Sequence, residues 1–322
     1  GFAPSAPLGT SQDKSVKLGI NVIRPILLLT REETAAYCRQ HDLNPRTDTS
    51  NLSLSPFRNR IRLRLLPLLK EYNPEIVEAL VRTARIAQDD MAFLESDAAK
   101  AWEKVARKEQ NNIVFEKKKF LALPLALQRE LLLKGIETLV GTLKDIELVH
   151  IEEVIDAMRK PAGRVIILPD SLEFVIEYER FVLGKDPAAL SPFPQLRGEF
   201  KLNVPGTTKL PGWVVTVTVV PPDVLKRDVA DYKAYLDFEK TGKDLTVRSR
   251  QPGDRFHPMG MTEPKKLNQF MVDSKIPHLW RERIPVVCSP EQIVWVVGYR
   301  IDERVKVMPE TKQLLELKFR RV

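Results

Sequence analysis

Cysteine and histidine are scarce in this chain, and their positions speak against a disulfide or a metal site. The two cysteines are Cys38 and Cys288, and so small a number is typical of reduced thiols in a cytoplasmic protein. The four histidines share no metal-ligand spacing with one another or with the cysteines. We therefore expect a cytoplasmic protein without a metal centre built from these side chains.

Long apolar runs are also missing. No stretch approaches the roughly 20 apolar residues that cross a membrane as a helix. The first residues, G-F-A-P-S-A-P-L-G-T, lack the basic region and apolar core of a secretory signal. We expect no membrane partner. The segment also has no initiator methionine, which indicates a processed chain or a fragment.

The glycine-rich loops that bind nucleotide phosphates are absent from the sequence. None of the patterns S-G-G-x-D-S, G-x-x-x-x-G-K-[ST] and G-x-G-x-x-G occurs. No Ser-His-Asp order or close pairing of histidine with a carboxylate stands out either. The sequence by itself therefore shows no complete ATP-binding loop and no triad of a hydrolase.

Positive charge is abundant and unevenly distributed. The formal net charge is +8, of which residues 245–322 carry +6 and residues 46–64 carry +4, so the rest of the chain is slightly acidic. Two separated basic regions suggest a large polyanion that is contacted at two places. Nucleic acid is the obvious candidate.

The first basic region, Arg46 to Pro67, reads as a polar loop followed by a short helix. Ser55 is a suitable N-cap, and Pro56 suits the first helical position. Three apolar residues recur every four positions and predict a buried stripe: Phe57, Ile61 and Leu65. Four guanidinium groups share this short helix: Arg58, Arg60, Arg62 and Arg64. Because they repel one another without an anion nearby, the pattern predicts phosphate or carboxylate binding; a solvated basic helix is the alternative.

The second basic region spans Arg248 to Arg283. Seven cations are candidates for phosphate contacts: Arg248, Arg250, Arg255, Lys265, Lys266, Arg281 and Arg283. Three nearby rings could stack on a base or ribose: Phe256, His257 and Trp280. The alternative is a solvated rim in which Asp254 and Asp273 form structural pairs with some of these cations.

Hydrophobic periodicity predicts a mixed chain in which helices precede strands. The helical patterns cover residues 31–42, 74–108, 124–140, 146–159 and 265–273. The strand patterns cover residues 164–169, 172–179, 180–184, 213–220, 245–250, 284–288, 292–301 and 314–319. The long helix over 74–108 has a heptad-like stripe, so a coiled-coil homodimer is an alternative to packing within the chain.

Three groups of residues, in this order, resemble the tRNA(Ile)-lysidine synthetase family. The first is I-R-P-I-L (residues 23–27), followed by D-x-S-N (48–51) and R-N-x-x-R (58–62). The second is L-A-L-Q-R-E-L-L (125–132). The third is R-x-R-x-P-G-D-R-F-x-P (248–258), followed downstream by K-K-L, K-I-P and R-x-x-I-P-V. Each piece is weak alone, but the combination is specific.

The resemblance implies an α+β multidomain protein. Residues 1–70 would be the C-terminal remnant of an α/β catalytic domain of the N-type ATP pyrophosphatase class. Residues 71–185 would be a helical substrate-binding middle domain with a small β part. Residues 186–235 would be a linker and a β segment, and 236–322 a small α+β tRNA-binding domain.

The resemblance also implies a reaction. The family uses ATP, with Mg²⁺ expected, to join free lysine to the wobble cytidine of the CAU anticodon of tRNA(Ile). Five residues that match the family's motif would line the catalytic pocket: Asp48, Asn51, Arg58, Asn59 and Arg62. Because S-G-G-x-D-S is missing, we expect the N-terminal ATP-binding part to be absent and the chain alone to be nearly inactive. A stand-alone tRNA-binding module and a structural basic protein are the alternatives.

Overall fold

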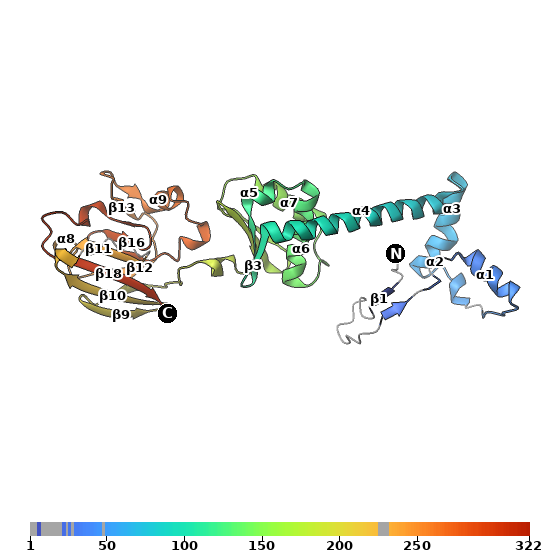
Figure 1. The fold of residues 1–322 in the computed structure, drawn as a ribbon, viewed down its shortest axis with the longest axis horizontal. Coiled ribbons are helices and arrows are strands. Elements are labelled where there is room, and N and C mark those ends of the chain that lie inside the picture. The colour runs from blue at the N-terminus through green and yellow to red at the C-terminus, as the bar shows by residue number, and fades with distance from the viewer. Residues whose placement is uncertain (1–4, 8–20, 24, 27–28, 47–48, 225–231) are drawn as a thin grey trace. The chain divides into compact units, whose positions relative to one another are not determined.

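The computed structural model describes residues 5–7, 21–23, 25–26, 29–46, 49–224 and 232–322 (Figure 1). By its internal contacts the chain divides into two units, Gly1–Ile86 and Ala87–Val322. The described elements are mixed, with several antiparallel sheets and with helices concentrated in the first half of the chain. This agrees with the predicted α+β class at the level of overall composition.

The first unit holds a two-stranded antiparallel ladder and several short helices. Its strands are β1 (Ser5–Pro7) and β2 (Asn21–Ile23), and its first helix is α1 (Arg31–Gln40). Thr30 and Glu33 form a capping box, with Thr30 N donating to Glu33 Oε2 at 2.6 Å and Glu33 N to Thr30 Oγ1 at 3.1 Å. Two orphan N–H groups are thereby satisfied, and the predicted start of this helix is confirmed.

The basic helix consists of three consecutive parts. These are α2 (Phe57–Arg60), a π-helical turn (Ile61–Leu65) and α3 (Leu66–Tyr72). Pro56 occupies the N-cap position without a side-chain bond, so the expected cap by Ser55 is wrong by one residue. The expected buried stripe is also wrong, because Phe57 is 69% exposed and Leu65 is exposed too. Periodicity shows which side chains share a face but not whether a core covers that face. Among the described residues up to Ile86, no apolar side chain is buried.

The long helix α4 (Ile76–Val105) is shorter than the predicted 74–108. Its apolar stripe is buried only in the last turns, at Ala98, Ala101 and Val105, while Met91 is 59% exposed. Small alanine side chains let the helix approach its core closely there. The homodimer through this helix stays a prediction.

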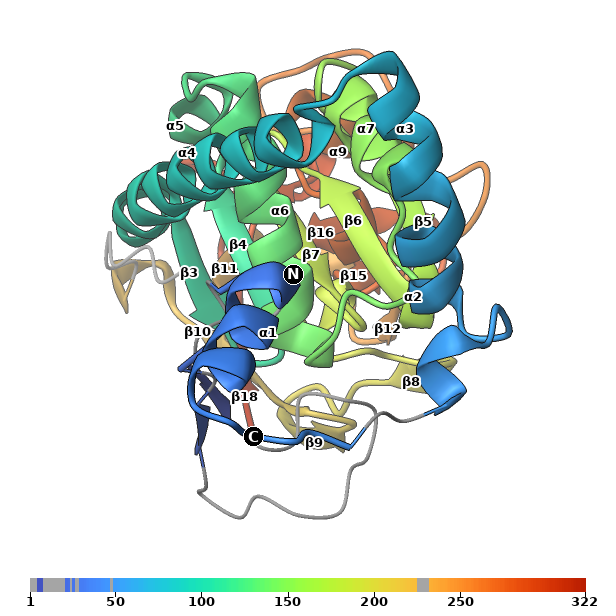
Figure 2. The ribbon, with the colours of Figure 1, turned by 90° about the vertical axis from the view of Figure 1, so that its right-hand side faces the viewer.

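The middle of the chain forms a five-stranded antiparallel sheet in the order β3-β4-β7-β6-β5. Its strands are β3 (Ala106–Glu109), β4 (Asn112–Glu116), β5 (Val165–Leu168), β6 (Leu172–Ile176) and β7 (Arg180–Gly184). The helices are α5 (Lys117–Leu121), α6 (Leu125–Val140) and α7 (Leu148–Met158). Figure 2 looks onto α6 and α7, which pack on one face of the sheet. The last three strands were predicted, whereas β3 and β4 were not.

The C-terminal half contains two larger sheets around one core. The four-stranded sheet has the order β11-β18-β10-β9, and its strands are β9 (Gly206–Leu210), β10 (Trp213–Val220), β11 (Lys233–Asp237) and β18 (Leu314–Arg321). The five-stranded sheet has the order β17-β16-β15-β12-β8. Its strands are β8 (Glu199–Lys201), β12 (Thr246–Arg248), β15 (Val286–Cys288), β16 (Ile293–Val296) and β17 (Arg300–Ile301). Because β8 pairs with β12 and β10 with β18, strands on both sides of residue 236 share their sheets.

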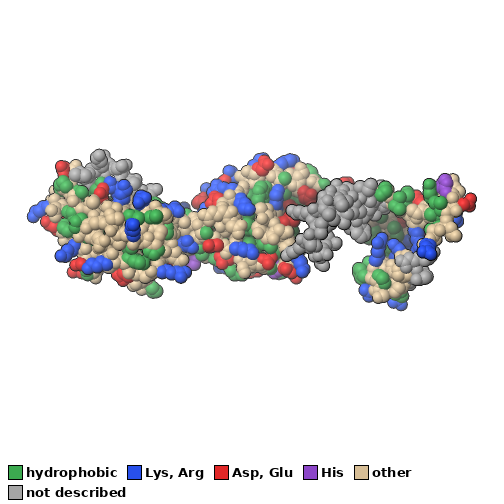
Figure 3. Space-filling model, turned by 90° about the horizontal axis from the view of Figure 1, so that it is seen from below, with side chains coloured by type: hydrophobic (Ala, Val, Ile, Leu, Met, Phe, Trp, Pro, Cys, Tyr) green, Lys and Arg blue, Asp and Glu red, His purple; other side chains and the backbone are tan. Residues whose placement is uncertain are grey.

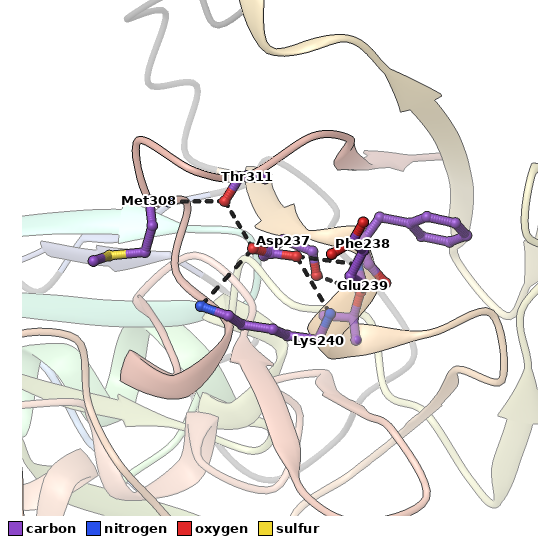
Figure 4. Close-up of polar contacts among 7 residues, drawn as sticks. Asp237, Phe238, Glu239, Lys240, Met308 and Thr311 are labelled. Carbon is purple, nitrogen blue, oxygen red and sulfur yellow. Dashed lines mark hydrogen bonds and ion pairs between the residues drawn. The ribbon is translucent and has the colours of Figure 1, made fainter.

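Smaller elements complete this half of the chain. They are the hairpin of β13 (Arg255–Phe256) and β14 (Lys265–Lys266), and the helices α8 (Phe238–Thr241) and α9 (Leu267–Asp273). Asp237 is 4% exposed and caps α8 through Glu239 N at 3.0 Å, while its Oδ2 accepts from Thr311 Oγ1 at 2.7 Å (Figure 4). This bond ties the start of α8 to the turn that precedes β18.

Candidate functional site

Asn59 organises the described part of the first basic region. Its side chain is buried, and Nδ2 donates to the carbonyl oxygens of Ser50 at 3.0 Å and Ser53 at 2.8 Å. Both amide hydrogens therefore hold the Thr49–Leu52 turn against α2. Asn51 is exposed on that turn, and Asp48 lies outside the described residues. The geometry makes Asn59 a residue that positions the loop; the pocket-lining role of these residues stays a prediction.

The arginines of this region lie in α2 and in the π-helical turn that follows it. Arg58 and Arg62 are exposed, and the guanidinium of Arg60 lies 5.3 Å from the ring centre of Phe57. Isolated π turns inside helices occur often at functional sites. Exposed guanidinium groups around such a turn suit a phosphate group, because they offer fixed forks of N–H donors.

In the second basic region Arg248 is a structural cation. Its NH1 and NH2 donate to the two carboxylate oxygens of Asp254, each at 2.9 Å, and both side chains are mostly buried. The hydrogen bond with Asp254 raises the pKa of Arg248. Asp254 Oδ2 also accepts from Gln251 N at 2.7 Å. The pair thus closes the Q-P-G-D turn, which was the alternative considered for this aspartate.

Two other cations of this region are paired at the surface. Arg250 pairs with Glu282, and Lys265 pairs with Asp273. The hydrogen bond from Lys265 lowers the pKa of Asp273. The acids of both pairs are exposed, and pairs at a protein surface contribute about 0–1 kcal/mol.

Arg281 lies inside the protein. It is 7% exposed, Nε donates to Ile276 O at 3.1 Å, and NH2 donates to Tyr178 OH at 3.3 Å. Its burial and these two internal bonds give no support to the predicted contact of Arg281 with RNA. Arg283 is half-buried.

The hairpin β13–β14 carries two neighbouring exposed cations. Arg255 and Lys266 are direct partners in the antiparallel ladder, both are exposed, and no ion pair joins either of them to a described residue. Like charges placed opposite each other destabilise a hairpin. An anion between them would remove that cost, so the hairpin is the part of this region best suited to phosphate.

The loop between β13 and β14 is held by Asp302, which sequence reasoning missed. Asp302 is fully buried and accepts from His257 N at 2.8 Å and from Arg304 Nε and NH2 at 2.9 Å. Burial alone would raise the pKa of Asp302, but the hydrogen bonds from Arg304 and His257 N outweigh it and hold the pKa below its usual range. The only sequence signal for Asp302 was its position directly after the predicted strand 292–301, in I-D-E-R.

The predicted stacking rings differ in accessibility. Phe256 is fully buried and packs edge-on against Phe270 with ring centres 5.0 Å apart, so the expectation that it stacks on a base is wrong. His257 and Trp280 are half-buried, and Arg180 lies 5.5 Å from the centre of the Trp280 ring. Phe256 supplies an apolar anchor for the hairpin.

Across the described ranges of the chain, no three or more His, Cys, Asp or Glu side chains are placed together to hold a metal ion. Among the described helices, none is both long and apolar enough to cross a membrane.

Two family models match the chain at opposite ends. The model of a PP-loop domain matches residues 3–69, and the model of the TilS substrate C-terminal domain matches residues 245–317. The first match does not bear out our expectation that the PP-loop domain is absent, although the S-G-G-x-D-S pattern does not occur in the sequence. The expectation of near inactivity depended on that absence and loses its support.

Curated proteins named tRNA(Ile)-lysidine synthase match nearly the whole chain. The one from Dehalococcoides mccartyi is 45% identical over 94% of this chain and 64% of its own length. The one from Symbiobacterium thermophilum is 31% identical over 94% of this chain and 65% of its own length. The one from Caldanaerobacter subterraneus is 30% identical over 93% of this chain and 64% of its own length. The chain thus spans somewhat less than two thirds of these relatives.

Among solved structures, a crystal structure of a TilS C-terminal domain is 22% identical. It covers 39% of this chain and 98% of its own length at a TM-score of 0.34.

Proposed function

We propose that this chain belongs to the tRNA(Ile)-lysidine synthases and takes part in the ATP-dependent ligation of lysine to the wobble cytidine of tRNA(Ile). The observation that carries the proposal is 45% identity to such a synthase over 94% of the chain. The alternative of a stand-alone tRNA-binding module is less favoured, because the similarity extends through the PP-loop match at residues 3–69.

The proposed reaction has two steps. The C2 oxygen of the cytosine attacks the α-phosphorus of ATP, and pyrophosphate leaves. The ε-amino group of lysine then attacks C2, the C–O bond to the phosphate breaks, and AMP leaves with the electron pair. Positive charge beside the phosphates stabilises both steps, because negative charge develops on phosphate oxygens in each.

Within this reaction the exposed arginines Arg58 and Arg62 would bind phosphate oxygens of ATP. Asp48 would hold the ammonium group of lysine, and Asn51 would lie in the same pocket on the turn that Asn59 fixes. The guanidinium groups fit phosphate by charge and geometry. The Mg²⁺ expected from the resemblance would accompany the phosphates of ATP.

The hairpin cations Arg255 and Lys266 would contact the tRNA backbone. Their opposed positions and exposure are the features that support this role. Arg250 and Lys265 would join them by giving up surface pairs.

Equilibrium binding of the chain to tRNA(Ile) with a CAU anticodon, compared with an unrelated tRNA over a salt series, tests the recognition part of the proposal. We expect tighter binding to tRNA(Ile), with log K falling against log salt at a slope of about −0.7 to −0.9 per neutralised phosphate. Equal binding of both tRNAs, or no binding at low salt, would contradict it.

A further inference from the structure

The sheet of the middle part (residues 106–184) has a second apolar face, opposite the face that α6 and α7 cover. Three valines on this second face are at most 1% exposed: Val114, Val175 and Val182. We call them the valine patch. Two leucines from outside the sheet pack against it, namely Leu190, which follows β7, and Leu279, which comes from the C-terminal part (residues 199–322). Leu279 therefore joins the C-terminal part to a core that is not its own.

The short stretch that carries Leu279 is fixed at both ends in the core of the C-terminal part. Ile276 is 1% exposed there and Ile284 is fully buried. Arg281 Nε donates to Ile276 O at 3.1 Å and closes the stretch on itself. We call residues 277–281 the latch. The latch is thus built as an extension of the C-terminal part, and it places one leucine on the valine patch.

The covalent connection between the two parts divides its side chains between their cores. Leu190 packs on the valine patch, whereas Phe193 is 3% exposed in the core of the C-terminal part. Only Ser191 and Pro192 lie between them. The proline ring fixes one backbone torsion, and rotation about the remaining torsions would separate the parts without disturbing either core. These two residues are therefore placed to act as a pivot.

The polar contacts beside Leu279 share a single hydroxyl group. Tyr178 OH donates to Val272 O at 3.3 Å and accepts from Arg281 NH2 at 3.3 Å. Both distances exceed the usual range for hydrogen bonds of these kinds. These bonds therefore hold the two parts together only weakly.

Two buried donors at the same contact have no partner among the described residues. They are Arg180 NH2 and Trp280 Nε1, and the guanidinium of Arg180 lies 5.5 Å from the centre of the Trp280 ring. A buried donor without an acceptor costs free energy, which is regained when water reaches it. The packing of Leu279 on the valine patch thus favours the closed contact, and the two donors favour its opening.

From this balance we infer that the latch is a releasable contact, which holds the C-terminal part on the middle sheet when closed and lets it swing about Ser191 and Pro192 when open. All of these contacts lie within Ala87–Val322, and none of them depends on the proposed ligase activity. Figure 3 shows Lys and Arg side chains on the surface of the C-terminal part, at the left, and of the middle part beside it. A polyanion that contacts both parts would shift the equilibrium toward the state that fits it better.

The distance between two spin labels, one on each part, measures the closed fraction in the full chain. The labels are attached to Asp156→Cys on α7 and Lys318→Cys on β18, because both side chains are exposed on regular elements. Cys38 is replaced by serine, and Cys288 stays because it is buried. Double electron–electron resonance then gives the distance distribution, and thermal unfolding verifies that each labelled form folds.

Four forms are compared: the unchanged latch, Leu279→Ala, Trp280→Phe and the control Leu139→Ala. Leu139 is also a partly buried leucine, but it packs on the helical side of the middle part. Leu279→Ala should lower the ratio of closed to open chains by about tenfold or more, because closing removes less apolar area from water. Trp280→Phe should raise the ratio, because a ring remains beside Arg180 while the unpaired N–H is gone. Leu139→Ala should leave the ratio unchanged.

Three results would overturn the inference. An unchanged distance distribution in Leu279→Ala would show that the latch does not hold the parts together. A lower ratio in Trp280→Phe would show that the unpaired donor does not oppose closure, and this variant keeps the test decisive if Leu279→Ala fails to fold. An equal loss in Leu139→Ala would reduce the effect to a general loss of stability. Each of these results leaves the proposed function standing, because transfer of lysine to tRNA is measured separately.

Discussion

Asp254 decides which arginine of the second basic region is available to a ligand. It takes both donors of Arg248 in a bidentate pair at 2.9 Å and leaves Arg255, on the next strand, exposed. Two arginines of one short motif therefore have different roles. Arg248 stabilises the Q-P-G-D turn, and Arg255 projects from the hairpin that follows this turn.

We expect Arg248→Ala to lower the free energy of unfolding by about 1–3 kcal/mol, because a mostly buried carboxylate loses its charge-assisted hydrogen bonds. Arg255→Ala should leave stability unchanged and weaken tRNA binding, with the salt slope falling in magnitude by about 1. Urea unfolding and the binding titration measure the two effects. A stable Arg248→Ala variant with weak binding would reverse the roles assigned to the two residues.

We expect Asp302 to make the stability of the protein depend on pH in the acidic range. Its pKa is depressed in the folded state, so its contribution to stability is present above its unfolded pKa of about 3.9 and is lost as pH falls through the folded value. Asp302→Asn should be less stable than the unchanged protein at pH 7, and the difference should shrink below about pH 4. Urea unfolding at pH 7 and pH 3 tests this. A difference that grows at low pH would contradict the assignment.

Asn59 is expected to hold the loop of the first basic region in place through its side-chain hydrogen bonds. In Asn59→Asp the side chain keeps its size but loses the N–H donors that hold Ser50 and Ser53. We expect faster proteolytic cleavage within residues 49–53 and at least tenfold lower ligation, on the order of the cost of a misplaced catalytic group. Asn51→Asp, on the exposed turn, is the matched control and should not change the cleavage rate.

At the scale of elements, α8 depends on a hydrogen bond from outside the helix. Thr311 Oγ1 donates to Asp237 Oδ2 and accepts from Met308 N at 2.9 Å, so one hydroxyl links the helix cap to the turn before β18 (Figure 4). Such a link matters because a helix of four residues is too short to be stable by itself.

Thr311→Val should lower the free energy of unfolding by about 1–3 kcal/mol, because the buried carboxylate of Asp237 and the part-buried N–H of Met308 lose their partner. Lys240→Gln removes a cation that lies 3.8 Å from the same carboxylate and is well exposed. Its effect should stay below about 0.5 kcal/mol. Chemical denaturation of both variants decides whether the hydroxyl or the charge supports the cap.

The elements also show which parts of the fold could be predicted from the sequence. Strong local signals succeeded, such as the capping box before α1, the end of α6 at Gly141 and the apolar runs of β5, β6 and β7. The strands β3 and β4 were missed because A-R-K-E continues a helical pattern, and pairing with β7 places β4 in the sheet. The spacing of Phe57 and Leu65 indicated a shared face but not whether a core covers it, so their burial was predicted wrongly.

The site was predictable in its residue types but less so in their roles. Spacing identified the cations of both basic regions, but it could not show that Arg248 faces Asp254 or that Arg281 is buried beside Tyr178. Those outcomes depend on contacts between residues far apart in the chain or across a turn. Asp302, which holds the hairpin loop, gave almost no local signal.

At the scale of the whole molecule, one chain would carry both a segment that uses ATP and surfaces that contact RNA. The family matches lie at residues 3–69 and 245–317, with the helical and sheet-forming middle part between them in sequence. The proposed contact with a polyanion at several places would account for a net charge of +8 that is concentrated in separate regions.

The most direct measurement is the transfer of isotopically labelled lysine to tRNA(Ile) by this chain. The account predicts lysine incorporation that requires ATP, releases AMP and pyrophosphate, and disappears when the wobble cytidine of the CAU anticodon is replaced by uridine. Loss of incorporation in Arg62→Ala, with tRNA binding retained, would place the first basic region in the chemistry. No incorporation into a tRNA that the chain binds tightly would contradict the proposed ligase activity.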